Sequence, residues 1–174
     1  TTEKTKPFEF GTPDGYRFWS ELGPMSNVDK KLFFGQVPTW NEWTAHDTYD
    51  EYWQSKNVPD DMNNIKLPVM NVCSLFDSED YYGAINIYHS LEKKNPENQS
   101  FLVLGPWKHG GFRSMDGSYL ANIRFGSKTS DYYHENIELP FFNYYLKEKG
   151  EFKPAEAIVF ITGSNQWKTF DEWP

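Results

Sequence analysis

Two short apolar runs, each followed by polar residues, constrain the fold of this chain more than any other feature. They occupy residues 67–73 and 101–104, and each has the length of a buried strand. Between them, residues 81–94 carry apolar side chains at helical spacing, at positions 81, 84, 85, 88 and 91. A strand, a helix and a second strand predict a βαβ unit, whose strands are parallel and whose following loops emerge at one edge. The sequence therefore predicts an α/β protein.

The loops after the two apolar runs contain an acid and a histidine. The first run leads into Asp77, Glu79 and Asp80, and the second leads into Gly105-Pro106-Trp107-Lys108-His109-Gly110-Gly111. Open α/β sheets carry their chemistry at the edge where such loops emerge. We therefore expect the Asp77 carboxylate to lie at or close to hydrogen-bond distance from Nδ1 of His109.

The acidic residues have two interpretations on local sequence alone. Asp77 is either an N-cap for the following helix or an acid that holds a histidine in one tautomer. Glu79 and Asp80 suit the first turn of a helix because the helix dipole favours negative charge there. Three carboxylates within four residues also repel one another, which raises their pKa values unless a cation relieves them. A substrate ammonium group would be such a cation.

His109 has the setting of a general base. Glycines on both sides place it on a loop rather than in a strand or helix, and Trp107 is expected to hold that loop. A histidine at a strand end, one crossover after a strand-end acid, is typical of catalysis. His46, His89 and His134 lack this setting, and no pair of histidines has metal-ligand spacing. We expect neither a metal nor another cofactor.

Composition excludes several classes of protein. The 17 Lys and Arg residues stand against 25 Asp and Glu residues, a net charge of −8, which disfavours binding to a nucleic-acid backbone. No apolar run approaches the roughly 18 residues needed to cross a bilayer, and residues 1–9 lack the apolar core of a signal peptide. The single cysteine, Cys73, cannot form an intrachain disulfide. Because the sequence begins without methionine, we expect a cropped or processed start.

The segments outside the βαβ unit give weaker patterns. Residues 1–31 are interrupted by Pro and Gly, so residues 16–22 form at most a short helix. In residues 31–55, aromatic segments at 40–45 and 49–54 are expected to form a small helical layer over the sheet. Residues 113–129 are expected to be irregular. Residues 131–148 return to helical spacing, with Pro140 as a kink or a new start. Residues 157–162 are a predicted strand with no partner nearby in sequence, so we expect it to pair with nothing in residues 1–150.

The motifs around Asp77 and His109 carry a family resemblance. Residues 75–84, Leu-Phe-Asp-Ser-Glu-Asp-Tyr-Tyr-Gly-Ala, and the Gly-Pro-Trp-Lys-His-Gly-Gly segment at 105–111 resemble the α-amino acid ester hydrolases. These belong to a serine hydrolase family that also holds cocaine esterase, X-Pro dipeptidyl-peptidases and certain glutaryl cephalosporin acylases. The resemblance extends over the chain through residues 27–54, 144–147 and 160–167.

The resemblance implies an α/β-hydrolase fold that supplies the C-terminal part of the parallel sheet. It implies a helical cap region at 1–66, the C-terminal half of the hydrolase domain at 67–150, and the beginning of a jelly-roll domain at 151–174. It further implies that Asp77 is the triad acid and His109 the general base, while Glu79 and Asp80 hold the α-ammonium group of a small ester or amide substrate. By the same resemblance, a periplasmic or secreted location is expected.

The nucleophile departs from the family pattern. Hydrolases of this fold place the nucleophilic serine before the acid, in Gly-x-Ser-x-Gly. None of the serines before Asp77, at positions 20, 26, 55 and 74, has that setting. We expect the polypeptide to be inactive alone and to work with the remainder of the same hydrolase, or with another copy of the chain, across an unprotected sheet edge. The alternatives are an acylase or dipeptidyl-peptidase with another acyl group, or a non-catalytic ligand-binding module.

Overall fold

The fold was obtained as a computed structural model, which describes residues 9–173 of the 174-residue chain. The chain divides into two compact units, one that reaches Lys56 and one that begins at Asn57. The predicted cap region, 1–66, spans the first unit and the start of the second, and its first eight residues lie outside the described part.

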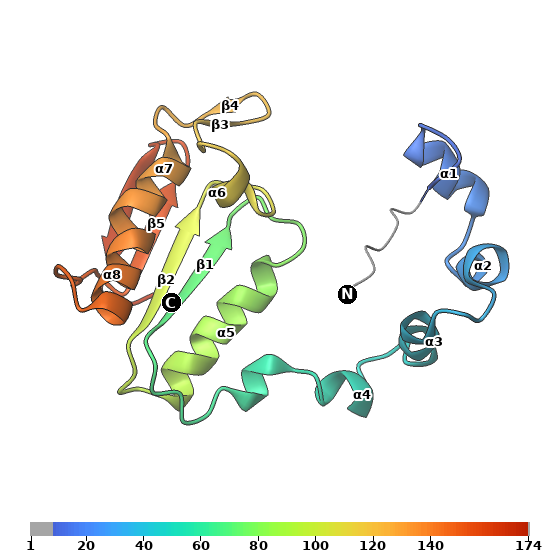
Figure 1. Ribbon diagram of the computed structural model, residues 1–174, viewed down its shortest axis with the longest axis horizontal. Coiled ribbons are helices and arrows are strands. Elements are labelled where there is room, and N and C mark those ends of the chain that lie inside the picture. The colour runs from blue at the N-terminus through green and yellow to red at the C-terminus, as the bar shows by residue number, and fades with distance from the viewer. Residues whose placement is uncertain (1–8, 174) are drawn as a thin grey trace. The chain divides into compact units, whose positions relative to one another are not determined.

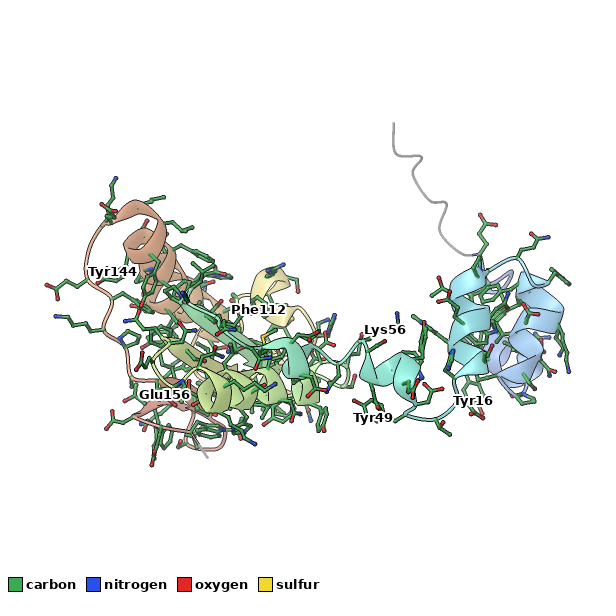
Figure 2. The ribbon with its side chains drawn as sticks, turned by 90° about the horizontal axis from the view of Figure 1, so that it is seen from below. Tyr16, Tyr49, Lys56, Phe112, Tyr144 and Glu156 are labelled. Atoms are coloured by element: carbon green, nitrogen blue, oxygen red, sulfur yellow. The ribbon has the colours of Figure 1, made fainter. Side chains whose placement is uncertain are left out.

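The first unit consists of short helices. Their bounds are α1 (Gly15–Leu22), α2 (Ser26–Val28), the π-helix η1 (Asp29–Phe33), α3 (Pro38–Ala45) and α4 (Glu51–Gln54). Asp14 and Asp50 cap α1 and α4, each accepting a backbone N–H with its side chain. The helices expected at 16–22, 40–45 and 49–54 are thus present. Many aromatic side chains of this unit are exposed, including Tyr16 and Tyr49 (Figure 2).

The second unit is built on a four-stranded sheet (Figure 1). Its strands are β1 (Val69–Ser74), β2 (Ser100–Gly105), β5 (Ala157–Ile161) and β6 (Gln166–Phe170), in the order β1-β2-β5-β6. The first three are parallel and β6 is antiparallel to β5. Helix α5 (Tyr81–Lys94) connects β1 to β2, so the predicted βαβ unit is confirmed. In this sheet β1 forms one edge.

Each face of the sheet is covered by helices. On one face, Leu102 and Leu104 pack with Tyr88 of α5. On the opposite face, Val103 packs with Tyr133 and Ile137. Side chains alternate between faces along a strand, so neighbouring residues of β2 enter different clusters. In Figure 2, Tyr144 and Glu156 lie on opposite sides of the sheet.

The second face is covered by one continuous helical segment. It comprises α7 (Thr129–Tyr133), the π-helix η3 (His134–Glu138) and α8 (Leu139–Lys147). Pro140 falls in the first turn of α8, directly after the π-helix η3, and its missing N–H coincides with this change of helix type. The predicted helical segment with a change at Pro140 is confirmed.

No helix within residues 9–173 combines the length and apolar character needed to cross a bilayer.

Short elements complete the second unit. The 3₁₀-helix η2 (Val58–Asp61) lies in the segment that precedes β1, and Ser90 and Lys94 of α5 both donate hydrogen bonds to the Pro59 carbonyl. After β2 come α6 (Gly111–Ser114) and two antiparallel strands of two residues each, β3 (Tyr119–Leu120) and β4 (Ile123–Arg124). The segment expected to be irregular thus contains a minimal hairpin.

The prediction for the last strand is wrong. β5 pairs in parallel with β2, with Leu102 opposite Ala157 and Leu104 opposite Val159. Parallel partners are joined by long crossovers, so β2 lies far from β5 in the sequence. The expectation that no partner lies nearby in sequence is also wrong, because β6, the next strand of the chain, pairs antiparallel with β5. Both faces of the sheet are covered, one by α5 and the other by α7 to α8. The assignment of residues 151–174 to the beginning of a jelly-roll domain stays a prediction.

Candidate active site

The loops after β1 and β2 leave the sheet at the same edge and are tied together by backbone hydrogen bonds. The N–H of Leu75 donates to the Gly105 carbonyl at 2.8 Å, and the N–H of Phe76 donates to the Trp107 carbonyl at 3.0 Å. These bonds continue the contact between the strands beyond their ends. As a result, the residues that follow, Asp77 and His109, are brought side by side.

Asp77 and His109 form the contact that the sequence predicted. Nδ1 of His109 lies 3.1 Å from Oδ2 of Asp77, and Oδ2 of Asp80 lies 3.6 Å from the same nitrogen. The Asp77 side chain is 7% exposed, whereas that of His109 is 53% exposed. The acid is therefore shielded from water, while the histidine ring is open to a reactant.

Asp77 is not the N-cap of α5, a position that Asp80 occupies, but its two oxygens have different partners. Oδ1 accepts the N–H of Glu79 at 2.8 Å and that of Asp80 at 3.3 Å, just before α5 begins. These bonds orient the carboxylate and leave Oδ2 for His109. Hydrogen bonds to the charged form favour ionisation. The N–H of Glu79 contributes most to lowering the pKa of Asp77, the N–H of Asp80 and the His109 contact add to it, and burial opposes it.

The acids around His109 favour its protonated form. Its pKa is raised, first by the hydrogen bond to Asp77 and then by the negative charge of Glu79, with Asp77 and Asp80 adding to the effect. An imidazole beside an ionised acid can accept a proton and be stabilised as an imidazolium, which is the task of a general base. The pair can therefore move a proton at the edge of the sheet.

Trp107 anchors the His109 loop to the second face of the sheet. Its ring is 2% exposed and packs among aromatic and aliphatic side chains of the second face. Its Nε1–H donates to Oγ1 of Thr129 at 2.9 Å, and that hydroxyl donates to the Gly117 carbonyl at 2.8 Å. The prediction that Trp107 holds this loop is supported by these contacts. Thr129 was not singled out from the sequence, because it lies in a segment without periodicity.

A pocket of about 300 Å³ opens beside the pair. It is lined by Val72, Cys73, Ser74, Asp77, Asp80, Ala84, His109, Gly110, Phe112 and Arg113. Burial raises the pKa of the Cys73 thiol to about 12, so Cys73 is a packing residue and not a thiolate nucleophile. Arg113 adds a cation to the pocket wall that sequence reasoning did not identify.

Glu79 and Asp80 differ in their relation to this pocket. Asp80 lines it, with 75% of its side chain exposed. Glu79 is exposed and acts on His109 through its charge. Oxygen or nitrogen atoms of Asp77, Asp80 and His109 lie within 4.8 Å of one another. In the described part of the chain, residues 9–173, these three side chains are the group that could hold a metal ion.

The remaining histidines have other surroundings. His89 is exposed on α5, as expected. His46 lies 2.6 Å from the Asp50 carboxylate, within the first unit. His134 contacts Glu138 and the Phe112 carbonyl, each at 2.6 Å.

Comparison with known proteins places these features in context. Residues 18–111 match the model of the family described as X-Pro dipeptidyl-peptidase (S15 family). The structure is similar to an aminopeptidase from the marine sediment archaeon Thaumarchaeota archaeon, with a TM-score of 0.85 and 28% identity over 99% of this chain. It is also similar to an α-amino acid ester hydrolase, with a TM-score of 0.85 and 29% identity over 92% of this chain. The chain spans 28% and 27% of the lengths of those two proteins. The comparison with curated proteins finds no match.

Proposed function

The chain belongs to the X-Pro dipeptidyl-peptidase (S15) family and has an α/β-hydrolase fold, and from this premise we propose that it forms part of a serine hydrolase for α-amino acyl esters or amides. The observation that carries the proposal is the contact between the shielded Asp77 and the open His109. The names of the matched proteins support it, since aminopeptidases and α-amino acid ester hydrolases act on substrates with an amino group.

In the proposed mechanism a serine from another part of the protein, or from a second copy of the chain, attacks the ester or amide carbonyl. His109 takes the serine proton at Nε2 and returns it to the leaving group, while Asp77 holds Nδ1–H and stabilises the imidazolium. Water then attacks the acyl-serine, His109 takes the proton of the water and returns it to the serine oxygen, and the acid product leaves. The position of β1 supports this arrangement. Because β1 is an edge strand of the described sheet, a further parallel strand can pair with it. The loop after such a strand would emerge at the edge that carries Asp77 and His109.

The pH dependence tests the role of His109. A general base must be neutral to accept a proton, and the neighbouring acids raise the pKa of His109 above the ordinary value of about 6.5. We expect kcat/KM of the full-length enzyme to rise with pH through this raised pKa, while Asp77, whose pKa is lowered, stays ionised. A profile of kcat/KM against pH checks this. A value of kcat/KM that does not change with pH around the raised pKa of His109 would contradict the role of His109 as the general base.

We propose that Glu79 and Asp80 bind the substrate ammonium group, and changing them should separate substrate classes. In the full-length enzyme, Glu79→Gln and Asp80→Asn should raise KM for α-amino esters by about 10-fold to 100-fold and leave acetyl esters nearly unaffected. A hydrogen bond to a charged group contributes roughly 1.5–3 kcal/mol, which corresponds to one to two decades in affinity. Steady-state kinetics on paired chromogenic esters measures the difference. Equal damage to both substrates would instead indicate that these residues position Asp77.

A second candidate within the same chemistry is cleavage of peptides after an X-Pro dipeptide, which the family match favours. Ester and dipeptide substrates both present an α-ammonium group, so the acidic residues alone do not distinguish them. The two substrate classes are distinguished by comparing kcat/KM of the full-length enzyme for an X-Pro anilide with that for an α-amino ester. A preference for the anilide of more than about tenfold, or roughly 1.4 kcal/mol in transition-state binding, would favour the peptidase.

A further inference from the structure

His134 connects the loop that follows His109 to the helical segment on the second face. Nε2 of His134 lies 2.6 Å from the carbonyl oxygen of Phe112, and Nδ1 lies 2.6 Å from Oε2 of Glu138. Phe112 belongs to α6, which begins two residues after His109, whereas His134 and Glu138 are the first and last residues of the π-helix η3. The imidazole ring therefore bridges two elements that are distant in sequence (Phe112 is labelled in Figure 2).

Both partners of the ring are hydrogen-bond acceptors. A backbone carbonyl can only accept, so the bond to Phe112 needs a hydrogen on Nε2. An ionised Glu138 can also only accept, so the bond to it needs a hydrogen on Nδ1. Glu138 has a second donor in the hydroxyl of Tyr133, at 3.3 Å from Oε1. Each ring nitrogen of His134 therefore contacts one acceptor, the Phe112 carbonyl on α6 or the Glu138 carboxylate on the helical segment.

The charges around the ring come from two neighbouring elements. Glu138 and Tyr133 belong to the helical segment, and Arg113 of α6 lines the same pocket as these two residues.

The helical geometry at His134 is unusual. The N–H of Leu139 donates to the His134 carbonyl, which makes the wide i to i+5 turn of a π-helix. Single π-helical turns occur frequently at functional sites. The loop held by the bridge also carries Trp107, whose indole bonds to Thr129 at the start of α7. The His109 loop is thereby fixed to the same helical segment on both sides of His109.

We propose that His134 is a positioning residue that fixes the loop of the general base His109 through the carbonyl of Phe112. The proposal rests on the proposed function, since it assigns His134 a role in placing the base of that reaction. It assigns His134 no contact with the substrate. A misplacement of about 1 Å in a catalytic group costs on the order of 10²-fold in rate.

Kinetics test the positioning role. His134→Gln, which cannot hold both acceptors, should lower kcat by about 10-fold to 100-fold with KM changed by less than about twofold. The matched control is His89→Gln, on the exposed side of α5, which should leave both constants unchanged. Glu138→Gln leaves a side-chain amide oxygen that can still accept from Nδ1, so this variant should lower kcat less than His134→Gln.

The outcomes separate this proposal from the function on which it rests. If His134→Gln retains the kcat of the unmodified enzyme, the positioning role is overturned and the role of His109 stands. If His109→Ala retains full activity, both the positioning role and the proposed function are overturned.

Discussion

Asp77→Asn should lower kcat of the full-length hydrolase by roughly 10⁴-fold, the size of effect seen when the acid of a serine hydrolase triad becomes an amide. The asparagine has the same shape, and its oxygen can still accept the N–H groups of Glu79 and Asp80. Its NH₂ group then faces Nδ1 of His109 and can only donate to it. The ring is forced into the tautomer whose Nε2 carries a hydrogen, and this nitrogen cannot accept the serine proton.

The same substitution should change the pH profile. The bond to Asp77 is the largest cause of the raised pKa of His109, so the remaining activity should depend on a lower pKa. Initial rates on an α-amino ester, measured across pH, give both quantities. Asp61→Asn, an exposed acid at the end of η2, is the matched control and should keep full activity. A loss of less than tenfold in Asp77→Asn, in protein with an unchanged circular dichroism spectrum, would remove Asp77 from the triad.

The sequence predicted the parallel β1–α5–β2 unit because each of its elements has a local signature. Helical spacing marks α5, and short apolar runs mark the two strands. The place of β5 beside β2 has no such signature. The pairing of β5 with β2 depends on how the helices α7 to α8 pack on the sheet. Parallel partners are joined by long crossovers, so the pairing leaves no local pattern in the sequence. Residue patterns therefore identified β5 as a strand but gave the wrong pairing.

The candidate site likewise contains residues that the sequence predicted and residues that it did not. The topology of one βαβ unit was enough to place Asp77 beside His109, because both follow strands that end at one edge. Thr129, Glu138 and Arg113 reach the site region only through tertiary packing. His134 looked unremarkable in sequence because its neighbours there do not include Phe112, the residue that it contacts in the fold.

Gly105→Ala should strongly destabilise the second unit. A Cβ at this position would lie 2.2 Å from both Cη2 and Cζ3 of Trp107 and 2.5 Å from Cε3. The indole cannot move aside easily, since it is buried and its Nε1–H bonds to Thr129. Overpacking of a well-packed interior costs about 1–3 kcal/mol and occasionally more. Because the obstacle is a rigid ring next to a central strand, we expect a loss of roughly 3 kcal/mol.

Gly83→Ala provides the matched control for this prediction. Gly83 lies inside α5, and a Cβ there would meet no atom within 4 Å. Alanine in a helix interior is favoured over glycine by about 0.5–1 kcal/mol, so this variant should melt at the same temperature as the unmodified protein or slightly higher. Thermal unfolding of the full-length protein, followed by near-ultraviolet circular dichroism of its tryptophans, compares the two variants. The folded fraction of Gly105→Ala should also hydrolyse ester slowly, because a displaced Trp107 carries the His109 loop with it. If Gly105→Ala melted like Gly83→Ala, the indole would not be the rigid support that sets the position of the general base.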